Sequence, residues 1–399
     1  MLQRGEALLL FFFLRLPTGL TKNENEGESE IFCQIRLLAE NDPEKLVFGN
    51  EEREKQIMRQ IEKVGPEIHG LVGKADQRDG SLIAKFYAIA QEVKRLMENV
   101  KDLRREATKK RLSAKRHLHQ VIFGEYGGEA EDMGELGPSA ETISKIFSGT
   151  TFQESCGGKG DTPAGKSLIN DFICLCAHSF QKKANDDKSI CKYNVDTTVD
   201  ANFKNWTAAW HENNHRICVN TPPLTPNPQN IRKLVALFER AVEREQTGSQ
   251  VKGVFGFVNN NEKNECNTTK VGSTCVNYIH TLSHGGIEWV NHLKNASQDL
   301  QDMARYAEES ESSLPQLEML EYNALLLYEE AKYSAHLPHA TPSNGTDTNS
   351  SNESYQESAT NSTNSSQEGE FEEEEEGEEN KDITWNGRLP WHIFFLMVF

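Results

Sequence analysis

A seven-residue repeat of apolar side chains between Glu51 and His119 constrains the fold of this chain more than any other feature. One series recurs at every seventh position: Ile61, Ile68, Ala75, Leu82, Ile89, Leu96 and Leu103. A second series lies three or four residues from the first: Ile57, Val64, Leu71, Phe86, Val93, Val100 and Ala107. Charged and amide side chains fill most of the other positions. The repeat predicts a long coiled-coil helix over residues 57–107, with its seam buried in a core or in a dimer.

Two points within this repeat weaken a helix. Proline removes one helical hydrogen bond and crowds the preceding turn, so Gly65-Pro66 predicts a kink or a new helix start. Asp79-Gly80 is a second weak point.

A second amphipathic stretch covers residues 278–336, and we expect Pro315 to break it. Two long amphipathic segments separated by a long insertion favour an antiparallel helical hairpin. The predicted fold is therefore mainly α: a long antiparallel coiled-coil helical hairpin with a disulfide-rich, loop-rich head.

The insertion, residues 123–277, supplies the predicted head. It is rich in Gly, Asn and Pro, and shorter helices are expected at residues 166–181 and 230–246. No periodic apolar face runs through it, so we expect disulfides to hold it together. An even number of cysteines predicts four disulfides, whose connectivity the sequence leaves open. The eight cysteines are Cys33, Cys156, Cys174, Cys176, Cys191, Cys218, Cys266 and Cys275. Cys174 and Cys176 are closer than zinc-ligand pairs usually are, which favours two adjacent disulfides.

Both ends of the chain have the character of removable signals. Residues 1–21 contain Arg4 and the apolar run Ala7–Phe13, as a secretory signal peptide does. The last apolar run, residues 389–399, would reach only about 17 Å as a helix, against roughly 30 Å of bilayer hydrocarbon. Behind a polar spacer, it predicts a GPI-attachment signal over residues 381–399, with Asn380 as the attachment residue. Residues 22–340 then form the folded domain, and residues 341–380 form a disordered Ser/Asn/Glu-rich stalk.

Net charge and glycosylation acceptors agree with a surface protein. The formal net charge is −18, which argues against a nucleic-acid partner. Acceptor sequences for N-glycosylation occur at Asn205, Asn267, Asn295, Asn344, Asn349, Asn352, Asn361 and Asn364. Used acceptors would mark surface positions.

Two sequence motifs could carry chemistry, and both have weak support. His211, Glu212 and His215 match H-E-x-x-H, in which two histidines one helical turn apart bind zinc and the glutamate acts as base. No G-x-x-H follows, and Asn213 and Asn214 are poor helix formers. Residues 160–167 match the phosphate-loop spacing, but no apolar strand precedes them. We expect no catalytic residue, no metal and no cofactor.

Taken together, these features resemble the variant surface glycoproteins of trypanosomes. The resemblance rests on the signal peptide, the heptad helix, the cysteine-rich insertion from Cys156 to Cys275, the returning helices and the GPI tail. The run Phe172–Cys176 is similar to the B-type N-terminal domain of that family. Because the last cysteine is Cys275, the cysteine-rich C-terminal domain of many members is not expected here.

The resemblance implies a function without catalysis. Such proteins are dimeric, elongated coat proteins, GPI-anchored in the external leaflet of the plasma membrane, that shield the cell and are exchanged to evade host antibodies. The implied partners are a second copy, the membrane and host antibodies. The alternatives are a GPI-anchored nutrient receptor on a related helical scaffold and, more remotely, an H-E-x-x-H zinc metalloprotease.

Overall fold

The computed structural model describes residues 25–72, 80–129, 139–176, 178–179, 191, 198–199, 203, 205–210, 218–243, 252–258, 266 and 274–336. All of these lie in one compact unit, residues 1–338. The predicted signal peptide, the stalk and the GPI signal lie outside the described residues.

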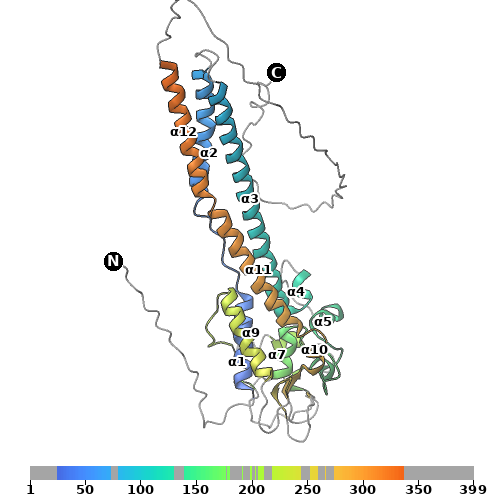
Figure 1. The fold of residues 1–399 in the computed structure, drawn as a ribbon. Coiled ribbons are helices and arrows are strands. Elements are labelled where there is room, and N and C mark those ends of the chain that lie inside the picture. Colours follow the sequence, from blue (N-terminus) through green and yellow to red (C-terminus); the bar gives the residue numbers. More distant parts are fainter. Residues whose placement is uncertain are drawn as a thin grey trace, which may run out of the picture. The chain divides into compact units, whose positions relative to one another are not determined.

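The described part of the chain is mainly α-helical, as predicted (Figure 1). Its helices are α1 (Glu26–Glu40), α2 (Glu51–Val72), α3 (Gly80–Phe123), α4 (Tyr126–Glu129), α5 (Ala140–Ile146), α6 (Phe152–Ser155), α7 (Leu168–Cys176), α9 (Pro228–Glu243), α10 (Ile279–Ser283), α11 (Glu288–Glu311) and α12 (Leu314–His336). The strands β1 (His178–Ser179) and β2 (Thr198–Val199) pair in parallel, and β3 (Val254–Phe257) and β4 (Thr274–Asn277) pair antiparallel.

The heptad repeat belongs to two helices, so the prediction of one helix over residues 57–107 is wrong. Helix α2 ends at Val72 and α3 begins at Gly80. Glu54 pairs with Arg104, and His69 contacts Tyr87, so the two helices run antiparallel. Both halves of the repeat line the same core.

Helix α2 continues through Pro66, so of the predicted kink or new helix start at Gly65-Pro66, the new start is wrong. Pro66 faces solvent and deletes only one backbone hydrogen bond, while Val64 and Ile68 on either side are buried. Gly65 has a packing role, because a Cβ there would lie 2.9 Å from Cε1 of Phe86 on α3. The chain reverses instead between Val72 and Gly80, beside the second weak point.

The returning helices pack on this pair. Helix α11 runs antiparallel to α3, since Arg104 pairs with Glu311 while Lys110 pairs with Asp299. The helix break at residues 312–313 comes just before Pro315, as predicted, and α12 then follows α2 (Figure 1). Helices α2, α3 and α12 share one hydrophobic core.

The predicted seam is filled within a single chain. Ile89 and Leu103 are half-buried. The other predicted seam residues are buried: Ile61, Ile68, Leu82, Phe86, Val93, Leu96 and Val100. A second copy therefore has no access to most of this seam.

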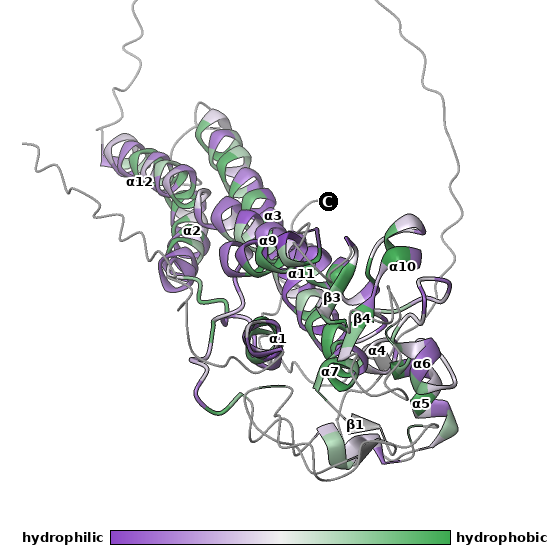
Figure 2. Ribbon diagram, turned by 90° about the horizontal axis from the view of Figure 1, so that it is seen from below, coloured by the Kyte–Doolittle hydropathy of each residue, from purple (hydrophilic) through white to green (hydrophobic). Residues whose placement is uncertain are grey.

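The head has a large hydrophobic core of its own, so the expectation that disulfides alone hold it is wrong. Helix α1 was not predicted from the sequence. It places Phe32 in the head core, where the ring lies 4.9 Å from that of Phe255 and 6.0 Å from that of Trp289. Every residue of α7 is buried, and Figure 2 shows this hydrophobic helix close to β3 and β4. Short elements from distant parts of the chain supply this core, and such elements leave no periodic pattern.

Candidate functional site

The two sequence motifs that could carry chemistry do not form a described site. His211, Glu212 and His215 lie outside the described residues. Among the residues that the structure describes, no three His, Cys, Asp or Glu side chains are grouped to hold a metal ion.

The phosphate-loop-like segment, residues 160–167, makes internal contacts instead of an anion cradle. The described residues before it form α6 and a turn, where a phosphate loop needs a strand. Lys166 Nζ donates to the Ser144 carbonyl at 2.8 Å and pairs with Glu125 at 3.2 Å. Ser167 Oγ donates to the Ile146 carbonyl at 2.8 Å. The Lys166 and Ser167 side chains thus connect the start of α7 to α5, and both already have partners within the chain.

All eight cysteines are paired in four disulfides. The pairs are Cys33–Cys218, Cys156–Cys174, Cys176–Cys191 and Cys266–Cys275. Cys174 and Cys176 thus belong to two adjacent disulfides at the end of α7. The Cys33–Cys218 bond joins α1 to the loop before α9 across 185 residues of sequence.

Asp171 on α7 is the centre of a buried polar network that joins α7 to α11. Its Oδ2 accepts hydrogen bonds from Tyr278 Oη at 2.7 Å and from Trp289 Nε1 at 2.6 Å. Its Oδ1 accepts from Asn170 Nδ2 at 2.7 Å. Burial raises the pKa of Asp171 from 3.8 to about 6, and these hydrogen bonds oppose the rise. Tyr278, buried beside this carboxylate, has a pKa well above its usual 10.

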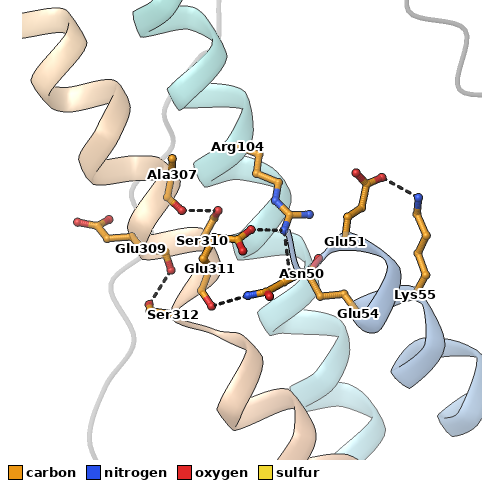
Figure 3. A network of polar contacts seen from close by, with 10 residues as sticks. All are labelled: Asn50, Glu51, Glu54, Lys55, Arg104, Ala307, Glu309, Ser310, Glu311 and Ser312. Carbon is orange, nitrogen blue, oxygen red and sulfur yellow. Dashed lines mark hydrogen bonds and ion pairs between the residues drawn. The ribbon is translucent and has the colours of Figure 1, made fainter. Parts of the chain in front are cut away.

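A second polar network links α2, α3 and α11 (Figure 3). Arg104 Nη2 lies 2.8 Å from Glu54 Oε1 and 3.2 Å from Glu311 Oε1. The side chain of Glu54 is only 1% exposed, and that of Arg104 is 14% exposed. The guanidinium also lies 4.6 Å from the ring of Phe48. This network holds α2 and α3 together where α11 ends.

Two histidines meet where α3 packs on α11. The Nδ1 atoms of His117 and His292 are 3.2 Å apart, and Gln120 Oε1 lies 3.1 Å from the same His117 nitrogen. Burial, with a smaller contribution from the neighbouring His117, lowers the pKa of His292 from 6.5 to about 4. His292 is therefore neutral at physiological pH.

These three polar groups were not predicted, although two of them leave a signal in the sequence. Asp171 is the charged residue within the apolar run Leu168–Cys176. Glu54 stands one heptad before Ile61, at a position where the repeat calls for an apolar side chain. His117 and His292 are far apart in sequence, and the sequence gives no signal that they form a pair.

The described glycosylation acceptors lie on the head side of the molecule. Asn295 is exposed on α11, and Asn205 is half-buried. The others lie outside the described residues: Asn267, Asn344, Asn349, Asn352, Asn361 and Asn364. Asn380, the predicted attachment residue, lies outside them as well.

Helix α12 carries an exposed apolar face. Met319, Tyr322, Leu326 and Tyr333 are 55%, 62%, 49% and 70% exposed, and they recur at intervals of three, four and seven residues. A groove of about 980 Å³ beside them is lined by residues of α2 and α12, Leu71 and Tyr328 among them. No helix in the described part of the chain is long and apolar enough to cross a membrane.

Comparison with known proteins identifies the family. No curated protein matches the chain. Residues 51–319 match the model of the trypanosomal VSG domain, from the start of α2 into α12. This match covers more than half of the chain and includes the helical core and most of the head. The family is one of structural surface coats and not one of enzymes. The chain therefore belongs to the trypanosomal variant surface glycoproteins, with a B-type N-terminal domain.

Proposed function

We propose that this protein is a GPI-anchored coat glycoprotein that shields the parasite cell and mediates antigenic variation and immune evasion. The match of residues 51–319 to the trypanosomal VSG domain carries this proposal. The helical scaffold and the head with four disulfides suit a role that is steric and antigenic. Variation of such a protein would fall on exposed head residues, and host antibodies would be its partners. Nucleic acid is not a proposed partner.

The proposed processing leaves a folded domain on a lipid-anchored stalk. Residues 1–21 are removed as signal peptide, residues 22–340 form the domain and residues 341–380 form the stalk. Residues 381–399 are exchanged for the lipid at Asn380, which places the protein on the external leaflet of the plasma membrane.

A GPI-cleaving phospholipase tests the anchor. Treatment of intact cells should release the protein, and the released form should lack residues 381–399 by mass spectrometry. A control with its last eleven residues deleted should be secreted without treatment, because the attachment signal is gone. Protein that stays membrane-bound after cleavage, or that retains Leu389–Phe399, would contradict the proposal.

We also propose a homodimer that uses the apolar face of α12. The seam of the heptad repeat is filled within one chain, whereas Met319, Tyr322, Leu326 and Tyr333 are exposed. An apolar stripe of this spacing suits the same stripe on a second copy.

The substitution Leu326→Glu tests this face. It should convert a dimer to a monomer in light scattering behind size exclusion, because each interface would bury a pair of carboxylates. Leu112→Glu is the matched control, since Leu112 is 56% exposed on α3 and away from this stripe. A monomeric wild type, or a variant dimer as stable as the wild type, would refute the dimer face.

A nutrient receptor on this scaffold is the alternative. A groove of about 360 Å³ between α9 and α11 is where a small ligand would bind, and Arg232, Glu239 and Lys294 line it. Few copies per cell would favour the receptor, and a dense coat would favour the proposal above.

A further inference from the structure

A pair of histidines bridges the two helices that carry the head. His117 on α3 and His292 on α11 place their Nδ1 atoms 3.2 Å apart. Gln120, three residues after His117 on α3, places its Oε1 3.1 Å from the same His117 nitrogen. Two potential metal-ligand atoms, His292 Nδ1 and Gln120 Oε1, thus lie within 3.2 Å of a third, His117 Nδ1, and they come from two antiparallel helices.

Charged side chains lie beside the histidine pair. Asp299 Oδ2 lies 3.9 Å from His117 Nε2, on the far side of the ring from His292. This distance is too long for a hydrogen bond. Gln120 Oε1 can only accept, so its contact makes His117 Nδ1 the donor, and a metal ion at Nδ1 would replace this proton while Nε2 takes the other on the side of Asp299. Lys110 Nζ holds Asp299 at 2.8 Å and Asp302 at 3.4 Å, so the local charge is one cation against two anions.

We propose that His117, His292 and Gln120 bind a divalent transition-metal ion of the zinc type, with water completing its coordination. Imidazole nitrogen is a preferred ligand of such ions, whereas Mg²⁺ and Ca²⁺ prefer oxygen. With metal–nitrogen distances of about 2.0–2.1 Å, two ligand nitrogens of a tetrahedral site lie about 3.3 Å apart. The observed 3.2 Å between the two Nδ1 atoms needs little adjustment.

The surroundings of the pair resemble those of a ligand set. A carboxylate that accepts a hydrogen bond from a metal-bound histidine orients its ring and raises its basicity, and Asp299 Oδ2, 3.9 Å from His117 Nε2, would need to move closer to take that role. His292 is neutral at physiological pH, as a ligand must be. The His117 side chain is 24% exposed, so solvent reaches the pair and gives an ion a path to it.

The bound ion would link α3 to α11 at the head, independently of the four disulfides. A ligand that binds only the folded state raises its stability by mass action. The competing explanation is a simple hydrogen bond between the two rings, which needs no ion and gives no metal dependence.

Titration of the purified full-length protein with Zn²⁺, after treatment with a chelator, tests the site. The H-E-x-x-H motif is a second zinc candidate, so the double variant His211→Gln/His215→Gln provides the background. In calorimetry this double variant should bind about one Zn²⁺ per chain and should not bind Mg²⁺. Adding His117→Gln or His292→Gln should abolish the binding. His119→Gln, in the same helix and outside the cluster, should leave it intact.

Two further measurements distinguish loss of the metal site from loss of folding. Zn²⁺ should raise the melting temperature of the background protein and not that of His117→Gln, with helix content by circular dichroism as the folding control. Should a glutamine variant fail to fold, the absorption of bound Co²⁺ in the background protein reports nitrogen coordination directly. Absence of zinc binding by the background, or binding unchanged by His117→Gln and His292→Gln, would overturn the proposal.

Discussion

At the residue scale, Asp171 shows how a polar group can be retained in an aromatic core. The carboxylate is completely buried, and its side-chain partners Tyr278, Trp289 and Asn170 are all neutral donors. They satisfy its oxygens without cancelling its charge, so the pKa stays raised. The network orders the junction of α7 with α11 at the expense of burying a charge.

Asp171 should make the stability of the protein depend on pH. Its folded pKa of about 6 lies above its ordinary 3.8, so the folded state binds the proton more tightly. Its stabilising contribution is therefore complete below about pH 4, falls as pH rises to about 6, and is absent above. The loss is on the order of 3 kcal/mol, since one pKa unit corresponds to about 1.4 kcal/mol.

Denaturant unfolding of the wild type and of Asp171→Asn from pH 4 to pH 7 measures the pH-dependent contribution of Asp171 to the free energy of unfolding. The asparagine does not titrate, so the difference in unfolding free energy between the two proteins should change over this window and level off above about pH 6. A difference independent of pH would show that Asp171 does not titrate as stated.

Arg104 neutralises a carboxylate that water cannot reach. Arg104→Met would leave Glu54 buried without its cation, and we expect a loss of about 3–5 kcal/mol in unfolding free energy. The double variant Glu54→Leu/Arg104→Met should recover most of this loss, because position 54 continues the apolar heptad. Equal loss in the single and double variants would mean that the ion pair itself stabilises the helix contact.

At the element scale, the close approach of α2 and α3 lets both halves of the heptad repeat pack in one core. Gly65 lets the Phe86 ring pack against the α2 backbone, and Pro66 beside it points to solvent. A residue that sequence rules treat as a helix breaker is therefore tolerated. The packing of Val64 and Ile68 outweighs the single hydrogen bond that Pro66 removes.

Gly65→Ala should destabilise the protein by about 1–3 kcal/mol, because its Cβ would overlap Phe86. Gly70→Ala in the same helix is the control, since nothing lies within 4 Å of its Cβ and alanine favours the helix by up to about 1 kcal/mol. Thermal melts of the two variants should shift in opposite directions. A Gly65→Ala melt at or above that of the wild type would contradict the packing role.

At the scale of the whole molecule, one disulfide closes nearly half of the chain into a loop. Cys33–Cys218 spans 185 residues, against nine for Cys266–Cys275. It attaches α1, which supplies the centre of the head core, to the loop that leads into α9. A long loop restricts the unfolded chain more than a short one does.

Replacing Cys33 and Cys218 together by serine should therefore cost more than replacing Cys266 and Cys275. The chain-entropy relation gives about 5 kcal/mol for the first loop and about 3 kcal/mol for the second. Unfolding in denaturant under non-reducing conditions compares the two double variants. An equal or smaller effect of the Cys33–Cys218 replacement would assign its role to local packing instead.

Much of the scaffold could be predicted because its signals are local. The seven-residue spacing indicates helices whatever their partners, and the break before Pro315 follows from the missing amide hydrogen. The approximate places of α7 and α9 and the mainly α class were predicted correctly, and the family match supports the class. The candidate sites were not predicted, because each combines residues far apart in sequence, such as Asp171 with Trp289 and His117 with His292.

The sequence by itself determined that the scaffold is mainly helical, which faces of the long helical segments are apolar and which family the chain resembles. Only the tertiary structure decided that the heptad repeat folds back on itself, that α1 completes the head core and which cysteines pair. The physical reason is that the polarity of a side chain indicates the environment that it needs, but not which other residue of the chain provides that environment. That choice depends on the chain reversal between Val72 and Gly80 and on contacts across more than a hundred residues.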